Sequence, residues 1–562
     1  MDKIQKIWKY PDPIPGGALS GMEDFRSIER QVLYSRGIEE RGQALKFLSG
    51  DYGEVDDPFA LLQMDRAVER IKRAIDRREP IVIYGDYDAD GVSSAALLYA
   101  GIKELGGRVA TYFPDRFTEG YGLNSGAIDI LAGEGCALII TVDCGVRAYQ
   151  EALHAREHGI DLIITDHHFP GEVLPEAYAL INPKQPGDEY PFKSLAGVGV
   201  AKKLMQAIRS TYGIADDESD LDLVAIGTVA DIVPLVGENR VLVRRGIELL
   251  NQTDRIGLQG LIKVAGYQGG TIDSTAIGFA LGPRINAAGR LRSAEMAFEL
   301  LVSEDLHRAD VLAEQLDQIN RERQEMMHEV VERALTQHEK QTDRGNVIID
   351  FDEDYHEGVI GLAASKLTEA FYRPSIVGRL QEDWITASAR SIPGFHMTRA
   401  LESAGEWMDR FGGHAAAAGL RIHRSKIHQL KAILEDEFDD QMADETLQPT
   451  LDIDGIATFK ELDDRMLHFH DKLAPFGAAN PRPLLVSKNV NVLSKRTVGR
   501  EGAHLKLRLE QNGKPFDAIA FRMGVRLSEL KSEIDVAYRL ERNHYLGFTT
   551  LQLNVVDFCS SD

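Results

Sequence analysis

Three short apolar segments of this chain each end in aspartate or histidine residues. Residues 80–90 run from an apolar stretch into DYDAD, residues 136–143 end in an aspartate, and residues 161–168 end in Asp-His-His. Segments with helical patterning lie between them, and this alternation predicts a doubly wound parallel sheet. In such sheets, ligands bind beyond the carboxyl ends of the strands. The sequence therefore predicts an α/β domain with a polar site at one edge of its sheet.

The residue types at these strand ends are those of a divalent-metal centre. Mg²⁺ and Mn²⁺ prefer carboxylate oxygens, and Mn²⁺ also accepts imidazole. Two ions held in this way could activate water and hold both oxygens of a phosphoryl displacement. A further aspartate follows the apolar run at residues 223–230. The predicted cluster consists of Asp88, Asp90, Asp143, His167, His168 and Asp231.

Other polar groups beside the predicted cluster have more than one interpretation. Asp86 and Asp166 could each cap a helix or orient a histidine. Cys144 stands next to predicted carboxylates rather than a base, so we interpret it as a packing residue. The glycines at 197 and 199 do not complete a dinucleotide-binding motif, and helix packing is the favoured interpretation.

The chain is too long for a single hydrophobic core. Its 562 residues predict three or four domains. We expect an N-terminal helical segment at 1–75, the catalytic α/β domain at 76–300, and one long connecting helix at 301–342. A second α/β domain is expected at 343–445 and a small β-barrel at 446–562.

Charge is distributed unevenly along the chain. The formal net charge is −24, but residues 484–526 hold nine basic and three acidic residues, which leaves this stretch at +6. Barrels of the OB type bind single strands through basic grooves and aromatic platforms. Phe516, Phe521 and Tyr545 are candidate platforms, although barrel core is the favoured interpretation for most of them. The hypothesis is that this domain adds affinity and processivity rather than catalysis.

Nothing in the sequence points to a membrane or an oxidising compartment. No stretch approaches the ~20 apolar residues that span a bilayer, and the N-terminus lacks the apolar core of a signal peptide. The three cysteines cannot form a disulfide framework. A cytoplasmic location is the expectation.

The motifs together resemble a known superfamily. DYDADG, TVDCG, TDHH and VADIVPL are similar to the four motifs of the DHH phosphoesterases, and YHEGVIGLAASKL and FGGHAAAAG are similar to their accessory DHHA1 domain. GPRINAAGR, SARSIPGF and PFGAANPRP narrow the resemblance to the RecJ family. It implies a DHH domain, a DHHA1 domain and an OB-like barrel, with 5′→3′ exonuclease activity on single-stranded DNA in repair and recombination.

The same resemblance implies roles for individual residues. Two Mn²⁺ or Mg²⁺ ions would be held by Asp88, Asp90, Asp143, His167 and Asp231. His168 would act as a ligand or in proton transfer, with Asp90 and Asp143 also counted as catalytic. Tyr84 stands where many relatives have histidine, which affects the expected shell of one ion. The DNA phosphates would be bound by Arg116, Arg284, Ser388, Arg390, Gly412, Gly413 and His414.

Family role also implies single-stranded DNA, a helicase and a single-strand-binding protein as partners. Two other functions stay open from the sequence. One is a DHH phosphodiesterase of short oligonucleotides or cyclic dinucleotides, although the long helix and basic barrel favour a polymer substrate. The other is a non-catalytic replication scaffold, which would be expected to lose the metal ligands that this chain keeps. No residue identifies a preference for DNA over RNA.

Overall fold

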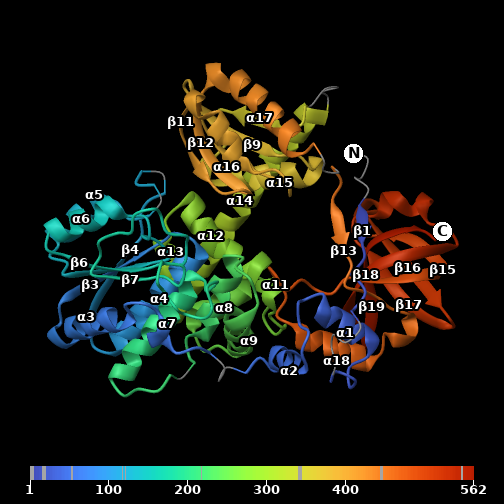
Figure 1. Cartoon of the computed structure of the whole chain (residues 1–562), viewed down its shortest axis with the longest axis horizontal. Helices are drawn as coiled ribbons and strands as arrows, with labels where there is room; N and C mark the ends of the chain where they lie inside the picture. The colour runs from blue at the N-terminus through green and yellow to red at the C-terminus, as the bar shows by residue number, and fades with distance from the viewer. Residues whose placement is uncertain are drawn as a thin grey trace.

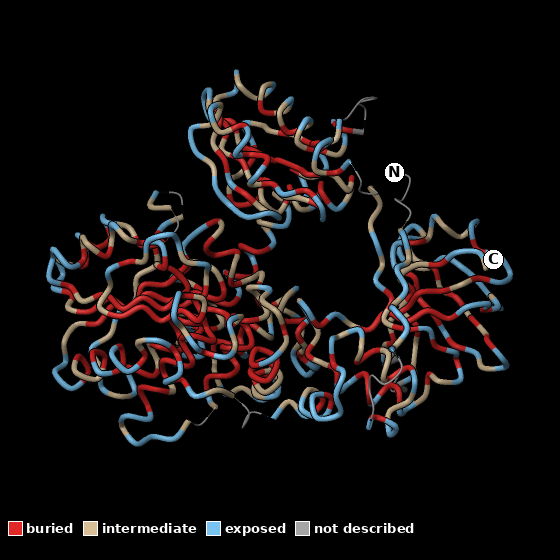
Figure 2. The backbone as a smooth tube through the Cα atoms, in the orientation of Figure 1, coloured by how far each residue is buried: buried red, intermediate tan, exposed pale blue. Residues whose placement is uncertain are grey.

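A computed structural model describes residues 6–15, 21–51, 55–116, 118–120, 122–216, 218–339, 345–443, 447–545 and 548–561. The chain forms an N-terminal α/β lobe, a second α/β lobe and a barrel lobe, which lie at the left, top and right of Figure 1. Each lobe has its own buried interior (Figure 2). The predicted fold class of two α/β units followed by a β-barrel is confirmed.

The N-terminal α/β lobe is built on a five-stranded parallel sheet. Its strand order is β4-β3-β5-β6-β7, and every pairing in it is parallel. The strands are β3 (Pro80–Gly85), β4 (Arg108–Tyr112), β5 (Leu138–Val142), β6 (Asp161–Thr165) and β7 (Ala179–Ile181). Near-continuous apolar runs are typical of strands buried on both faces, and β5 is buried along its whole length.

Helices cover both faces of this sheet. Ile81 and Ile83 point to one core, with α3 (Met64–Arg77), α4 (Ala89–Glu104) and α7 (Gly197–Thr211). Val82 and Tyr84 alternate to the other face, under α5 (Ser125–Gly133) and α6 (Tyr149–Glu157). This alternation follows from the two-residue period of a strand. It brings the polar residues that follow β3, β5 and β6 to one edge.

Further helices complete the lobe and lead out of it. They are α8 (Leu221–Ala230), α9 (Gly237–Leu250), α10 (Ile256–Val264), the short α11 (Ser274–Ala276), a π-helical turn (Ile277–Leu281), α12 (Gly282–Leu291) and α13 (Glu295–Leu301). The long helix α14 (Leu306–Glu339) contacts α10, α12 and α13 near its start and α15 of the second lobe near its end. It therefore joins the two α/β lobes (Figure 1).

The second α/β lobe contains a mixed five-stranded sheet in the order β11-β12-β10-β9-β8, whose only parallel pairing among described residues is β8 with β9. Its elements are β8 (Ile348–Asp352), α15 (Glu357–Phe371), β9 (Ser375–Gln381), β10 (Trp384–Arg390), α16 (Met397–Ser403), β11 (Met408–Gly413), β12 (Ala417–His423) and α17 (Ile427–Gln441). Helices α16 and α17 share one core, and α15 packs with α14 in another. Strand β10 ends at Arg390, which faces the first lobe's polar edge.

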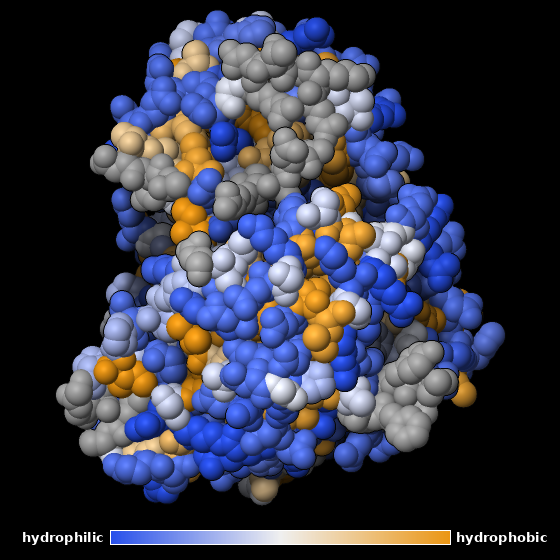
Figure 3. Space-filling view, turned by 90° about the vertical axis from the view of Figure 1, so that its right-hand side faces the viewer, coloured by the Kyte–Doolittle hydropathy of each residue, from blue (hydrophilic) through white to orange (hydrophobic). Residues whose placement is uncertain are grey.

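The barrel lobe is a six-stranded sheet closed by pairing of β15 with β18. Its elements are β14 (Gly455–Ile456), α18 (Asp464–Leu473), β15 (Leu485–Val498), β16 (His504–Gln511), β17 (Lys514–Ala520), β18 (Glu533–Tyr545) and β19 (Phe548–Ser560). The face of the molecule on this side is mainly hydrophilic, with scattered apolar side chains (Figure 3).

The N-terminal residues that we expected to form a helical segment divide between two cores. Strand β1 (Ile7–Lys9) pairs with β13 (Thr450–Asp452), and Trp8 Nε1 donates to Asp557 at 3.0 Å. Helices α1 (Ser27–Tyr34) and α2 (Arg41–Ser49) share the core of the barrel, whereas α3 belongs to the first lobe. Both ends of the chain therefore build the barrel lobe.

A buried arginine joins the first lobe to the barrel lobe. Arg240 on α9 is 2% exposed and donates hydrogen bonds to the carbonyls of Phe47, Lys472 and Leu473. Carbonyl acceptors from two distant segments thus satisfy one guanidinium, as a buried cation requires. Among the described residues, no helix is both long and apolar enough to cross a bilayer.

Candidate functional site

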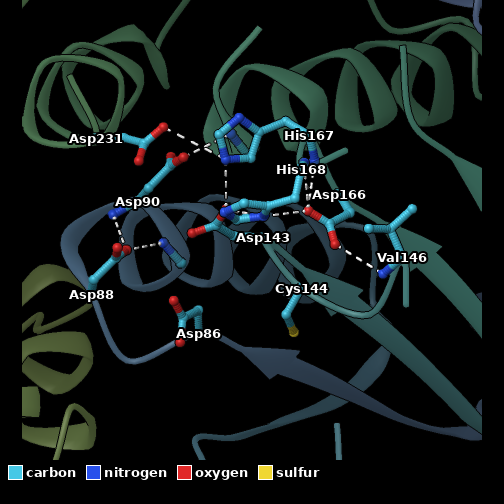
Figure 4. A network of polar contacts seen from close by, with 12 residues as sticks. Asp86, Asp88, Asp90, Asp143, Cys144, Val146, Asp166, His167, His168 and Asp231 are labelled. Carbon is cyan, nitrogen blue, oxygen red and sulfur yellow. Dashed lines mark hydrogen bonds and ion pairs between the residues drawn. The ribbon is translucent and has the colours of Figure 1, made fainter. Parts of the chain in front are cut away.

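The polar edge of the first sheet gathers carboxylates and imidazoles from four segments (Figure 4). We call these residues the metal cluster: Asp86, Asp88, Asp90, Asp143, His167, His168 and Asp231. Three overlapping groups offer ligand atoms within 4.8 Å of one another: Asp143 with both histidines, Asp90 with His167 and Asp231, and Asp86 with Asp88 and Asp143. The structure thus brings all six predicted residues together and adds Asp86.

The turn from β3 into α4 explains the spacing of the first aspartates. Asp88 caps α4, because its Oδ1 accepts hydrogen bonds from the backbone N–H of Asp90 at 2.9 Å and of Gly91 at 3.1 Å. A Cβ atom at position 91 would lie 2.4 Å from the Asp86 carbonyl oxygen. Glycine at 91 therefore lets the chain turn tightly enough to aim the carboxylates of three aspartates at one site.

The start of α7 holds Asp90 in place. The N–H of Gly197 donates to Asp90 Oδ2 at 2.7 Å, and the N–H of Val198 donates to Oδ1 at 2.8 Å. A helix N-terminus stabilises a carboxylate in this way. A Cβ at 197 would lie 2.7 Å from the Asp143 Cβ, so only glycine allows this approach. Of the two glycines that we interpreted as helix packing, Gly197 also positions two members of the metal cluster, whereas Gly199 packs next to Leu195.

Asp143 sits in an unusual backbone conformation. Its φ is 61°, in the left-handed region, where residues other than glycine are uncommon. The side chain is 2% exposed, and its Oδ1 lies 3.1 Å from His167 Nε2. A strained backbone persists only where the surrounding structure enforces it, and such residues cluster at functional sites.

The carboxylates repel one another strongly. Burial and the neighbouring Asp88 raise the pKa of Asp90 to about 7, and burial together with Asp90 and Asp88 raises the pKa of Asp231 to about 9. Burial and the nearby carboxylates also raise the pKa of Asp143 well above its ordinary value. These carboxylates can all be ionised at once only when bound cations neutralise their negative charge. The donor set of carboxylate oxygens and imidazole nitrogens therefore fits divalent cations.

The two histidines differ in their surroundings. Burial and the nearby His168 lower the pKa of His167 to about 3, which keeps its imidazole neutral, the form that binds metals. Burial lowers the pKa of His168 as well, but its hydrogen bond to Asp166 and the negative charges of Asp166, Asp90 and Asp88 together outweigh burial and raise it. The two histidines therefore suit different tasks: a ligand and a proton carrier.

Asp166 positions His168 rather than joining the metal cluster. Its Oδ1 lies 2.8 Å from His168 Nδ1 and accepts from two backbone N–H groups, while its Oδ2 accepts from Val146 N at 2.9 Å. Burial raises its pKa, but these hydrogen bonds and the positive charge of His168 together outweigh burial and lower it. Of the two interpretations left open, the structure supports orientation of a histidine.

Tyr84 points away from the metal cluster. It is fully buried, its hydroxyl donates to the Gly122 carbonyl at 3.0 Å, and Asn124 Nδ2 donates back to that hydroxyl at 3.1 Å. Its ring stacks on Tyr112 with centroids 5.3 Å apart. Tyr84 therefore anchors the segment before α5 instead of contributing a ligand. Cys144 is buried in the same apolar core, and burial raises its thiol pKa, as suits a packing residue.

A second group of like charges lies next to the metal cluster, at the boundary between the two α/β lobes. A pocket of 630 Å³ is lined by Asp86, Asp88, Asp166 and His168 from the first lobe and by His414 from the second. Four arginines line the same pocket, which we call the arginine pocket: Arg116, Arg147, Arg290 and Arg390. Arg147 also donates a hydrogen bond to the Phe169 carbonyl at 3.0 Å, whereas the other three are the candidates for binding a ligand. Burial, Arg116 and Arg323 lower the pKa of Arg290 to about 10. Clustered guanidiniums of this kind fit a phosphate group.

One predicted phosphate ligand lies elsewhere. Arg284 forms an ion pair with Asp317 on α14, with Nη2 at 2.7 Å from Oδ1, and donates to the Ala280 carbonyl. Arg290, six residues further along α12, occupies the arginine pocket instead. The structure thus places Arg290, and not the predicted Arg284, at the arginine pocket. Both arginines belong to the motif that drew attention to this helix, so the sequence signal was present but did not tell them apart.

The remaining predicted phosphate ligands lie beside the arginine pocket. Ser388 and Gly412 line an adjoining hollow together with Arg116, and His414 reaches the arginine pocket itself. Gly413, with φ 154°, makes the tight turn between β11 and β12, where a Cβ would lie 2.4 Å from the Ala417 carbonyl oxygen. Glycine at 413 thus sets the position of His414.

Comparisons with known proteins agree with this geometry. Residues 80–228 match the N-terminal domain of the DHH family, residues 344–440 match the DHHA1 domain, and residues 453–557 match the RecJ OB domain. The chain is 35% identical to the single-stranded-DNA-specific exonuclease RecJ of Salmonella typhimurium, over 95% of this chain and 96% of that protein. The chain belongs to the RecJ family.

Other members of the RecJ family extend the comparison. The Bacillus subtilis RecJ is 40% identical over 92% of this chain, and the match spans 65% of the length of that longer relative. The crystal structure of Thermus thermophilus RecJ in complex with Mn²⁺ superposes with a TM-score of 0.86 at 27% identity, covering 99% of this chain and 80% of that one.

Two residues of this site are not predicted from the sequence, although one of them, Asn286, lies within the GPRINAAGR motif. Asn286 Oδ1 accepts from Ala89 N at 2.7 Å and lines the arginine pocket. Lys184 lies close enough to Asp231 to lower its pKa. Each comes from a segment remote from the four motifs, and only the tertiary fold brings it to the site.

Proposed function

We infer that this protein is a metal-dependent exonuclease that hydrolyses phosphodiester bonds of single-stranded DNA. One observation carries the inference: the metal cluster and the arginine pocket share a single cavity, so a phosphodiester can lie at the metals while a neighbouring phosphate lies among the guanidiniums. The named relatives are single-stranded-DNA-specific exonucleases, and related structures contain Mn²⁺ or Mg²⁺.

The overlapping ligand groups support two divalent ions. Asp90, His167 and Asp231 would hold one, and Asp88 and Asp143 with Asp86 or His168 would hold the other. When bound, such ions lower the pKa of water and stabilise the charge that develops on the phosphoryl oxygens. Gly197 and Val198 hold the carboxylate of Asp90 through their N–H groups, which fixes one side of the site before substrate arrives.

His168 is the proposed proton carrier. Its Nδ1 faces Asp166 at 2.8 Å, so its Nε2 is available toward the cavity that it lines. Its raised pKa keeps a larger share of the imidazole protonated near neutral pH. A proton held there suits delivery to the leaving oxygen of the cleaved bond.

The arginine pocket accounts for the proposed direction of digestion. Arg116, Arg290 and Arg390 would bind the terminal 5′-phosphate, which places the first phosphodiester at the metal cluster and gives 5′→3′ release of mononucleotides. Since Arg390 and His414 come from the second lobe, both α/β lobes are needed for binding the end.

The barrel is proposed to bind the strand beyond the active site. Arg496, Arg500 and Arg522 are exposed, and the exposed ring of Phe521 packs edge-on against His504 at 5.3 Å. Other basic residues of the +6 stretch are engaged inside the protein, for example Arg526 with Asp557. Phe516 belongs to the core, and the side chain of Tyr545 lies outside the described residues. The exposed arginines and Phe521 are therefore the candidates for strand binding.

The biological setting follows from the family. We propose that the protein acts in DNA repair and recombination in the cytoplasm. A helicase and a single-strand-binding protein as partners stay predictions from family role.

Digestion of end-labelled strands tests the function. With Mn²⁺ present, a single strand labelled at its 5′ end should release the label as mononucleotide before a 3′-labelled strand does. Duplex DNA and RNA of the same sequence serve as controls. Early release of the 3′ label would overturn the polarity, and equal digestion of duplex would overturn strand specificity.

The two alternative functions give different outcomes in the same assay. A phosphodiesterase of short substrates would cleave dinucleotides or cyclic dinucleotides much faster than long strands. A non-catalytic scaffold would show no metal-dependent cleavage. The intact set of ligands in the metal cluster favours the enzyme over the scaffold.

A further inference from the structure

A separate group of metal-binding side chains lies on helices α5 and α6, which cover the outer face of the first sheet (Figure 1). His154 and His158 are four residues apart at the C-terminal end of α6, and Asp129 projects from α5. His154 Nε2 lies 2.7 Å from Asp129 Oδ1, and His158 Nε2 lies 3.0 Å from the same oxygen. The two rings lie with centroids 4.7 Å apart.

We propose that Asp129, His154 and His158 form a second metal site, for Zn²⁺ or a similar transition-metal dication. The three ligand atoms lie within 4.8 Å of one another. Tetrahedral zinc with bonds of about 2.0–2.1 Å holds its ligand atoms about 3.4 Å apart. The imidazole nitrogens lie 2.7 and 3.0 Å from the carboxylate oxygen, so small side-chain rotations that widen these separations would admit the ion. Residues at i and i+4 share one face of a helix, so the two imidazoles need no backbone change to meet one ion.

The chemistry of this site differs from that of the metal cluster. Two imidazoles and one carboxylate select zinc, copper or nickel over magnesium and calcium, which prefer oxygen ligands. The side chains are 28%, 38% and 57% exposed for His154, His158 and Asp129, so an ion can enter from solvent and complete its shell with water. Binding here is independent of the exonuclease reaction.

The ion would tie α5 to α6 at a distance from the reaction. The segment before α5 contributes Gly122 and Leu123 to the arginine pocket, and the start of α6 contributes Glu151. A link between the two helices therefore stabilises the wall of that pocket. The expected consequence is a zinc-dependent rise in the thermal unfolding temperature, since a ligand that binds only the folded state stabilises it.

Metal titration tests the site, with the metal cluster disabled so that it does not compete. The full chain carrying Asp143→Asn and His167→Ala, purified without a histidine tag and kept in excess Mg²⁺, is titrated with ZnCl₂ by calorimetry. The same protein is titrated with Co²⁺, whose visible absorption reports nitrogen ligation. One equivalent of each metal should bind. Adding His158→Ala or Asp129→Asn should weaken binding by at least about tenfold.

A matched variant controls for loss of any surface histidine. His328 is exposed on α14 and pairs with Glu332 at 3.7 Å, without a second imidazole in that pair. His328→Ala should leave the zinc affinity unchanged. Equal zinc affinity with and without His158, or no binding at all in the parent, would overturn the proposal.

A second measurement covers the case in which the disabled protein does not fold. The otherwise unaltered chain saturated with Mg²⁺ should take up one more equivalent of Co²⁺ than its His158→Ala variant. Identical uptake and identical Co²⁺ absorption in the two proteins would overturn the proposal.

Discussion

The metal cluster concentrates negative charge, and the arginine pocket beside it concentrates positive charge. In each, like charges are held together and partly removed from water. Burial and mutual repulsion raise the pKa of Asp90 and Asp231 in the metal cluster, and burial with neighbouring guanidiniums lowers the pKa of Arg290 in the arginine pocket. Each group is therefore built for a counter-ion: divalent cations in one and phosphate in the other.

The two sites differ in how the chain builds them. Every residue of the metal cluster comes from the first lobe, and each lies shortly after the end of a strand or helix. The arginine pocket takes residues from both α/β lobes and from one particular face of α12. Substitutions in the metal cluster should thus abolish phosphodiester hydrolysis, whereas substitutions in the arginine pocket should alter which strand ends the protein binds.

The largest effect is expected from Asp143→Ala. Loss of a shared ligand should reduce cleavage by about 10³-fold or more, because metal ions supply several kcal/mol of transition-state stabilisation. The rate of single-strand digestion at saturating Mn²⁺ measures it. Asp76→Ala, an exposed carboxylate paired with Lys72, is the matched control and should keep full activity. Retained activity in Asp143→Ala would contradict the metal centre.

Gly197→Ala should weaken catalysis from outside the ligand set. The added methyl would sit 2.8 Å from Asp143 Oδ1 and displace that carboxylate, so apparent Mn²⁺ affinity should fall by about 10–100-fold. The Mn²⁺ dependence of the cleavage rate measures it. Gly133→Ala at the end of α5, where a Cβ meets nothing within 4 Å, is the control and should behave as the parent. An unchanged Mn²⁺ dependence in Gly197→Ala would show that the contact is not needed.

Arg290→Ala should reduce the preference for a 5′-phosphate. Loss of a charge-assisted contact of about 1.5–3 kcal/mol corresponds to about a 10–100-fold change in selectivity between 5′-phosphate and 5′-hydroxyl strands. Competition between the two strands measures the ratio. Arg284→Ala is the informative comparison: it breaks the ion pair with Asp317, so it should lower the unfolding temperature and leave the selectivity intact. The reverse pattern would restore Arg284 as the phosphate ligand.

The smallest effect concerns pH and stability without metal. The carboxyl pKa values of about 7 for Asp90 and about 9 for Asp231 lie above the ordinary value of 3.8. The folded state therefore binds more protons than the unfolded state, and stability falls as pH rises through 7 and 9. Thermal unfolding in chelator should show this decline between pH 6 and 9, and Mn²⁺ should suppress it. A metal-free protein that gains stability over this range would contradict the repulsion.

The same contrast explains how much could be predicted from the sequence. Candidate ligands that follow an apolar strand can be recognised from the sequence alone, because the carboxyl ends of parallel strands meet at one edge of the sheet. The sequence predicts Asp88, Asp143 and His167 in this way, and the same alternation predicts the fold class. It does not decide the role of Asp86, because a residue that follows a strand can be a metal ligand or a helix cap.

The arginine pocket could not be resolved in the same way. Arg284 and Arg290 are six residues apart, which places their side chains about 120° apart around a helix, so they point in different directions. Choosing between them requires knowing which side of α12 faces the second lobe. The pairing of β1 with β13 was also beyond the sequence, because three residues carry too little pattern to predict a partner more than four hundred positions away.

The contact between Trp8 and Asp557 has a consequence for biosynthesis. The apolar faces of α1 and α2 are completed only by the strands at the far end of the chain. At about 5–20 residues per second, a ribosome takes on the order of 30–100 s to make those strands after the first helices emerge. Until then the apolar faces of α1 and α2 lack the partner against which they pack in the folded protein, and exposed apolar surface of this kind favours aggregation or chaperone binding.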